Sequence, residues 1–102
     1  MTKQMIEITF GNALTQAKQL DACAEDMLRV ANSGISEAKA NLGAAWQGDS
    51  ANAYIEKLDL TAENIRKTAK KLQEIAETLR GVARVFRDAE LKALDLAEKT
   101  VV

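Results

Sequence analysis

The sequence predicts an all-α protein, an antiparallel hairpin of two long helices that dimerises into an elongated four-helix bundle. Three observations lead to the hairpin. The 102 residues include no proline, the residue that interrupts helices most strongly. Apolar residues recur three and four positions apart along two long segments, the spacing that places side chains on one helix face. Between these segments, near the midpoint of the chain, lies a short stretch suited to a tight turn, Trp46-Gln47-Gly48-Asp49.

Residues 1–10 are expected to form an extended lead-in to the first helix. Ile6 to Phe10 alternates apolar and polar residues as a strand does, but a lone strand has no pairing partner in a helical chain. The segment has no apolar run followed by a small-residue cleavage site. Nowhere does the chain reach the ~18 consecutive apolar residues of a membrane span. We therefore expect synthesis in the cytoplasm without a cleavable signal peptide, so that any export requires a route independent of one.

The first helix is predicted over about residues 12–45. Steps of three and four along this segment meet apolar residues throughout, with Asp21 as the one polar exception. Gly34 costs about 1 kcal/mol relative to alanine inside a helix, yet the apolar positions stay in phase across it. A single continuous helix is therefore expected. Cys23, beside this apolar stripe, is interpreted as a partly buried structural cysteine. The stripe consists of Leu14, Ala17, Asp21, Ala24, Leu28, Ala31, Ile35, Ala38, Leu42 and Ala45.

Residues 46–49 are predicted to form the turn. Gly48 is suited to the positive φ that ends a helix, because it has no Cβ to clash with the backbone. Asp49 and Ser50 are favourable caps for the next helix, and the carboxylate of Asp49 also complements the positive end of the helix dipole. Trp46 is the only tryptophan in the sequence. Its ring is expected to lie across the facing helix and to anchor the turn.

The second helix is predicted over about residues 51–98, where apolar residues follow a heptad repeat. Every seventh residue from Leu58 to Phe86 is large and apolar, and the column four residues later is alanine up to Ala83. Six heptads in one register are typical of coiled coils. Small residues beside a large-residue seam allow two helices to approach closely. The predicted core and dimer seam comprises Leu28, Ile35 and Leu42 of the first helix and Leu58, Ile65, Leu72, Ile75, Leu79 and Val82 of the second.

The apolar stripe of the second helix is three columns wide, which is more than one neighbouring helix covers. An isolated hairpin would expose a long apolar strip, and soluble monomers rarely expose such large apolar patches. Pairing two hairpins into an antiparallel four-helix bundle removes the strip from water. The partner is either a second copy, which gives a homodimer, or a similar helical hairpin, which gives a heterodimer. At ~1.5 Å per residue, the longer helix would span ~70 Å.

Composition argues against catalysis and against nucleic-acid binding. The chain has no histidine, the commonest general base and metal ligand. Its serines and threonines are scattered, and no glycine loop has phosphate-binding spacing. The net charge of −1 gives no electrostatic reason to expect a nucleic-acid partner. We therefore expect a protein that is not an enzyme, with no cofactor, no metal, no nucleic acid and no small-molecule substrate.

The turn and its surroundings resemble those of a known protein family. Trp46-x-Gly48 lies centrally between two long helices in a chain of about a hundred residues, and small residues follow it as far as the aromatic Tyr54. This pattern resembles the W-X-G family of small early-secreted-antigen-like (Esx-like) proteins that type VII secretion systems export. The family has a second signature, a Tyr followed after three residues by Asp or Glu. Phe86 and Glu90 match its spacing and its acidic residue, with Phe in place of Tyr.

The resemblance implies a small secreted substrate of a type VII (ESX-like) secretion system, a dimeric helical-bundle virulence or interaction factor or an export partner. Export would proceed through the membrane ATPase of the secretion system, and the protein would be extracellular. Phe86 and Glu90 would then serve as the secretion signal, since residues four apart share one helix face. Trp46 and Gly48 would form the turn motif, with Trp46 also contributing to a surface that the secretion machinery contacts.

Two other functions are compatible with the same residues. One is a dedicated targeting partner, similar to a chaperone, that binds a larger type VII-secreted toxin carrying a related N-terminal hairpin. A heteromeric complex on co-expression would favour it. The other is a cytosolic coiled-coil adaptor unrelated to secretion, for which Phe86 and Glu90 would be replaceable without an effect on export.

Overall fold

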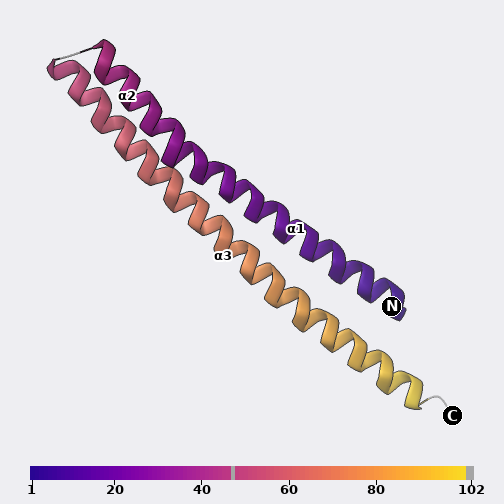
Figure 1. Cartoon of the computed structure of the whole chain (residues 1–102). Coiled ribbons are helices and arrows are strands. Elements are labelled where there is room, and N and C mark those ends of the chain that lie inside the picture. Colours follow the sequence, from indigo (N-terminus) through magenta and orange to yellow (C-terminus); the bar gives the residue numbers. More distant parts are fainter. Residues whose placement is uncertain (47, 101–102) are drawn as a thin grey trace. The chain divides into compact units, whose positions relative to one another are not determined.

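The structure, a computed structural model, describes residues 1–46 and 48–100 and confirms the all-α hairpin (Figure 1). Among the described residues there is no strand, and no helix is apolar over a stretch long enough to cross a membrane. The second helix starts and stops close to the predicted bounds of about 51 and 98. The elements are α1 (Lys3–Arg29), a π-helical segment η1 (Val30–Gly34), α2 (Ile35–Ala45) and α3 (Asp49–Thr100).

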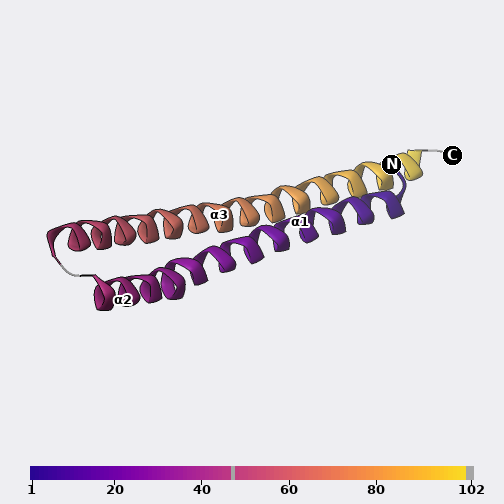
Figure 2. The ribbon, with the colours of Figure 1, turned by 90° about the horizontal axis from the view of Figure 1, so that it is seen from above.

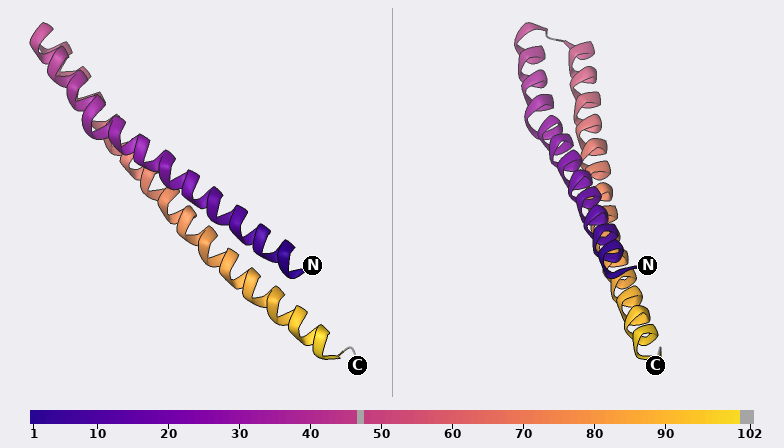
Figure 3. Two further views of the ribbon diagram at one scale, coloured as in Figure 1. Left: turned by 45° about the vertical axis from the view of Figure 1, so that its right-hand side comes forward. Right: turned by 90° about the vertical axis from the view of Figure 1, so that its right-hand side faces the viewer.

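The helical residues before the turn (α1, η1 and α2) are called the N-terminal arm. The chain divides into two compact units, each of which pairs one stretch of the N-terminal arm with one stretch of α3. The terminal unit comprises residues 1–21 and the part of α3 from Glu74 onward. The turn unit comprises Ala22–Gln73, which includes η1, α2 and the turn. Within each unit the paired helices run in opposite directions (Figures 2 and 3). That residues 1–102 act as a single domain stays a prediction.

The N-terminal residues form helix, and the predicted extended lead-in is wrong. α1 begins at Lys3 rather than near residue 12. Thr2 caps this helix, because its hydroxyl accepts a hydrogen bond from the Met5 backbone N–H (3.2 Å) and its carbonyl accepts one from the Ile6 N–H (3.0 Å). Ile6 is fully buried in the terminal unit. The helix thus satisfies its own backbone groups and buries Ile6, whereas an extended segment would have no pairing partner for those groups.

Alanine makes up most of the buried core in both units. Of the ten buried hydrophobic residues that the structure describes, eight are alanines. The alanine column of α3 therefore faces the other arm, as the small-residue spacing predicts. A buried methyl group stabilises by only about 0.8 kcal/mol. The alanine column therefore allows close helix approach but contributes modestly to stability. The buried alanines are Ala17, Ala24 and Ala31 of the N-terminal arm and Ala51, Ala62, Ala69, Ala76 and Ala83 of α3.

The first arm stays helical through Gly34, with a local change of hydrogen bonding. Val30–Gly34 is π-helical, and the Ile35 backbone N–H donates to the Val30 carbonyl, five residues earlier. Arg29 and Ile35, which flank the segment, keep right-handed helical dihedral angles. The predicted continuous helix is therefore confirmed, with one wider turn inserted. Ala31 and Ile35 are both buried, so the seam continues through η1.

The turn unit holds a small aliphatic cluster beside its alanines. Ala31, Ile35 and Ala62 are buried together. Leu58 and Ile65 are partly buried and pack against them. Ile35, Leu58 and Ile65 were all predicted for the seam, and here they contribute to the contact between the two arms of the hairpin.

Candidate functional site

The turn motif lies between α2 and α3. The Trp46 backbone N–H closes the last turn of α2, while Trp46 itself is extended. Gly48 has φ +114°, which confirms the positive dihedral angle predicted for this glycine. Its carbonyl accepts a hydrogen bond from the Asn52 N–H (3.1 Å) at the start of α3. The first turn of α3 contains Asp49, where a carboxylate complements the helix dipole. Gln47, the middle residue of the motif, lies outside the described residues.

Trp46 pairs with an aromatic residue of the facing helix but keeps much of its surface exposed. Its ring lies 6.3 Å from that of Tyr54, centroid to centroid, with the planes tilted by 56°. Aromatic pairs in such tilted arrangements stabilise beyond simple area burial. The predicted contact with the facing helix is therefore present. Trp46 is 43% exposed and Tyr54 is 53% exposed, so the pair also presents an aromatic surface to solvent at the turn.

The two residues of the predicted secretion signal lie in the terminal unit, one helical turn apart on α3. Phe86 is 38% exposed, and Glu90 is half-buried. Residues four apart lie on the same face of a helix. Glu90 occupies a position of the alanine column, seven residues after the buried Ala83. A carboxylate therefore follows the last buried alanine of the alanine column.

Phe86 is one of the α3 residues that line an apolar hollow of about 250 Å³. The opposite wall comes from α1: Thr9 and Phe10 had been predicted to lie in the extended lead-in, and Ala13 in the first helix. Val82 and Phe86 also line a second hollow on α3, together with Thr78, Gly81 and Val85. The first hollow is lined by Thr9, Phe10 and Ala13 of α1 and by Leu79, Val82, Ala83 and Phe86 of α3.

Arg87 holds Phe10 against α3. The guanidinium carbon of Arg87 lies 4.1 Å from the centroid of the Phe10 ring, a separation at which a cation and an aromatic face attract each other. The Arg87 Nε also donates a hydrogen bond to Asp88 Oδ1 (3.3 Å). The Phe10 ring thus lies against Arg87 and lines the same hollow as Phe86, and this contact could not be foreseen while Phe10 was assigned to a lead-in.

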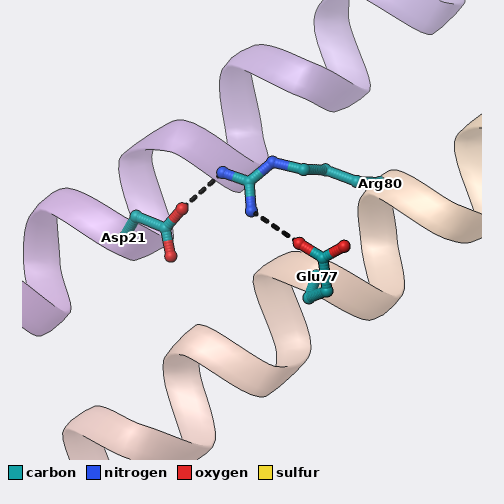
Figure 4. A network of polar contacts seen from close by, with 3 residues as sticks. All are labelled: Asp21, Glu77 and Arg80. Carbon is teal, nitrogen blue, oxygen red and sulfur yellow. Dashed lines mark hydrogen bonds and ion pairs between the residues drawn. The ribbon is translucent and has the colours of Figure 1, made fainter.

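An ion-pair network links the two helices of the terminal unit (Figure 4). The Arg80 guanidinium donates to a carboxylate oxygen of Asp21 on α1 and to Glu77 Oε2 on α3, at 3.4 Å for the latter. The hydrogen bond to Asp21 is the main reason that the pKa of Arg80 is raised above its usual value. The network explains why the apolar stripe of the first helix is interrupted at Asp21. Sequence reasoning noted Asp21 but missed Arg80.

A family model described as WXG100, proteins of 100 residues with WXG, matches residues 5–91. The chain belongs to the WXG100 family. No curated protein and no solved structure matches it. The family is one of small helical-hairpin substrates of type VII secretion systems that are not known as enzymes. The matched range includes both Trp46-x-Gly48 and Phe86 to Glu90.

In this WXG100 chain one column of α3 makes polar or cation–π contacts with the other arm. We call it the polar column, and its residues recur at multiples of seven. In the turn unit it contacts Lys39 and Asn32, the latter through a hydrogen bond from Arg66 Nε (2.9 Å). In the terminal unit it contacts Asp21 and Phe10. The polar column consists of Asp59, Arg66, Arg80 and Arg87.

The predicted seam residues of this WXG100 chain fall into two groups. Ile35 is buried, and most of the others are half-buried along the hairpin: Leu28, Leu42, Leu58, Ile65, Leu72 and Leu79. Ile75 and Val82 are 53% and 60% exposed. They belong, together with the 55% exposed Leu96, to what we call the outer column. These outer residues keep more than half of their surface exposed, although Val82 also lines the hollow between α1 and α3.

Cys23 is exposed, and its predicted partial burial is wrong. It precedes the buried Ala24 by one residue, and consecutive residues point about 100° apart around a helix. The seam is narrow enough that this rotation carries Cys23 out of it. The described residues include no cluster of acidic and cysteine side chains arranged to hold a metal ion.

Proposed function

We propose that the protein is a small type VII secretion substrate that leaves the cell paired with a second helical hairpin in a four-helix bundle. Membership of the WXG100 family supports the secretion class. In the proposal the chain is made in the cytoplasm, crosses the membrane without a cleavable signal peptide and acts outside the cell. Its role there is that of a virulence or interaction factor, or of an export partner for another substrate.

The exposure of the outer column is the main observation that supports pairing with a second hairpin. Val82 is 60% exposed, and Val85, three residues further along α3, is 70% exposed. Full burial of a valine, leucine or isoleucine side chain stabilises by roughly 1.5–3 kcal/mol. Because the core within each unit is built mainly from alanine, a second hairpin on this face adds the large apolar contact that the single chain lacks. A homodimer and a heterodimer with a similar hairpin both satisfy this requirement.

Phe86 and Glu90 are proposed as the export signal that the membrane ATPase of the secretion system reads. The ring is partly exposed on α3, and the carboxylate lies one turn further along the same face. Core packing accounts for an apolar residue at position 86 but gives no reason for a carboxylate in the alanine column at position 90. The position of Glu90 therefore favours recognition over packing.

The proposal is tested by immunoblotting culture medium and cell lysate of the native organism, with a cytosolic marker to control for lysis. Wild type is expected in the medium, and Glu90→Ala is expected to stay in the cells. Glu74→Ala is a matched control, since Glu74 is an exposed carboxylate of the same helix and its loss is expected to leave export unchanged.

Three other results would change the proposal. Export of both wild type and Glu90→Ala would mean that the signal lies elsewhere, for example on a partner. Recovery of the chain bound to a larger toxin would favour the targeting-partner function. Retention of wild type under conditions in which the secretion system is active would contradict secretion and favour a cytosolic adaptor.

A further inference from the structure

We propose that η1 is a register switch of the turn unit, in which the π-helical turn converts to α-helix and rotates α2 about its own axis. In the observed register, Lys39 and Trp46 contact α3. In the second register they turn away, and Ala38 and Ala45 face α3 instead. The switch goes beyond the proposed export function, because it determines how the turn motif presents its tryptophan ring.

The π turn changes which residues of α2 face α3. It inserts one residue into the helix, so that every later residue is rotated back by about 100° relative to an uninterrupted α-helix. Ala38 is exposed and Lys39 is half-buried, which is the reverse of what the uninterrupted apolar stripe predicts. Ile35 is buried and Leu42 is half-buried. The observed face therefore runs through Ile35, Lys39 and Leu42.

The same segment also contains a second face, which is entirely apolar. It is the face that an uninterrupted α-helix would turn toward α3. Ile35 and Leu42 belong to both faces, so a change of register exchanges only Lys39 and Trp46 for two alanines. The sequence thus supports either register. The second face consists of Ala31, Ile35, Ala38, Leu42 and Ala45.

Few interactions distinguish the two registers. The rotation would break the Lys39–Asp59 ion pair and the contact between the Trp46 and Tyr54 rings. Ion pairs as exposed as this one contribute little to stability. In return, the second register replaces the rare π turn with ordinary α-helical hydrogen bonds. Residues 32–34 are Asn, Ser and Gly, which are weak helix formers, so the segment resists rearrangement less than its neighbours do.

The test measures how fast a cysteine at position 38 reacts with a thiol reagent. Ala38→Cys is made together with Cys23→Ser, so that the chain has a single thiol. Position 38 is exposed in the observed register and would be covered by α3 in the second. Asp59→Lys replaces the ion pair to Lys39 with two like charges. We expect the labelling rate to fall about tenfold, as the second register becomes the major one.

Deletion of Ser33 is the variant that locks the observed register. Removing one residue turns η1 into α-helix while Lys39 and Trp46 keep their positions relative to α3. The labelling rate at position 38 should then stay high, with or without Asp59→Lys. Glu56→Lys is the matched charge reversal and should leave labelling unchanged. Glu56 is exposed and, within the described part of the chain, forms no ion pair.

A second measurement needs no substitution and covers the case in which Asp59→Lys unfolds the chain. Trp46 is the only tryptophan and contacts Tyr54, so its fluorescence emission reports the register. Salt at about 1 M screens the pair between Lys39 and Asp59. The emission of the wild type should therefore move to longer wavelength, and that of the Ser33 deletion should stay unchanged.

Either response supports the switch, provided that it is absent from the Ser33 deletion. An unchanged labelling rate in a folded Asp59→Lys variant, together with wild-type emission that does not respond to salt, overturns it and means that α2 has a single register. Equal slowing by Glu56→Lys also overturns it, because the effect would not depend on the ion pair. The same response in the Ser33 deletion overturns it as well, since η1 would then play no part.

Discussion

The two flanks of α3 beside its alanine column make different kinds of contact. Residues four after an alanine lie about 40° to one side of it, and residues six after lie about 120° to the other side. The first position gives the polar column, from which Arg66 and Arg80 reach side chains of the other arm. The second gives the outer column, in which Ile75 and Val82 are more than half exposed. One flank is used within the chain, and the other is left open.

This difference indicates how the two arms of a hairpin packed along an alanine column obtain a defined register. Each heptad of α3 from Ala62 to Ala83 presents the same small residue to the other arm, so the seam alone would tolerate a shift by one heptad. The polar column removes that freedom, because Asp59, Arg66 and Arg80 each meet a particular polar side chain. The outer column is more than half exposed at Ile75 and Val82, and it is the face that we propose a second hairpin to cover.

The largest expected effect follows from placing a charge in the outer column. Val82→Asp is expected to weaken pairing at least about 100-fold, because the carboxylate would be buried without a partner. The fold of the single hairpin should persist, since Val82 is 60% exposed there. Native mass against concentration measures the effect, with circular dichroism as the check on helicity. Gln73→Asp is the control, because Gln73 is exposed and shares the heptad position of the polar column. Unchanged pairing of Val82→Asp would show that the outer column faces solvent.

A smaller but clear effect on stability is expected from enlarging a residue of the alanine column. Ala76 is fully buried, and Ala76→Leu adds three carbons at this position, which has no free space beside it. Overpacking of this kind costs about 1–3 kcal/mol, which urea unfolding at fixed protein concentration would detect. Ala53→Leu on the exposed surface of α3 is the matched substitution. Equal stability of the two variants would contradict close packing at the alanine column.

The smallest effect is expected on the polar flank. Arg80→Asp should lower the melting temperature slightly, because it places a second carboxylate beside that of Asp21. The exchanged pair Asp21→Arg with Arg80→Asp should recover part of the loss. Exposed and half-exposed ion pairs contribute little individually. A double variant no better than Arg80→Asp alone would mean that the two side chains do not interact in solution.

The same pair predicts how stability responds to alkaline pH. The pKa of Arg80 is raised, chiefly by its hydrogen bond to Asp21, so its contribution is complete below the usual arginine pKa and is lost only as pH rises through the raised value. Between about pH 6 and 9 the difference in melting temperature between wild type and Arg80→Met should therefore be constant. A difference that changes within this range would point to another titrating group.

Sequence reasoning succeeded where one local pattern decides the outcome. The alanine column needs only a seven-residue repeat to be recognised, and it is buried along α3 as predicted. Gly48 needs only its lack of a Cβ and its place between two helices, and it has the predicted positive φ. Both signals are contained within a few turns of the chain.

It failed where the outcome depends on residues far apart in sequence. Asp21 and Arg80 are 59 positions apart, so their pairing requires the register of the two arms, which no local pattern gives. The strand-like alternation from Ile6 to Phe10 concealed a helical spacing in which Ile6, Phe10 and Ala13 share one face. Because that segment was read as extended, the α1 half of the hollow beside Phe86 was missed.

The pairing of two hairpins is tested most directly by the native mass of the protein purified intact from the organism that makes it. The chain has a mass of 11.1 kDa. We expect a particle of two hairpins, either two copies of this chain or one copy with a similar helical partner, because a second hairpin would cover the exposed outer column of α3. A folded, fully helical monomer of 11.1 kDa at micromolar concentration would contradict it.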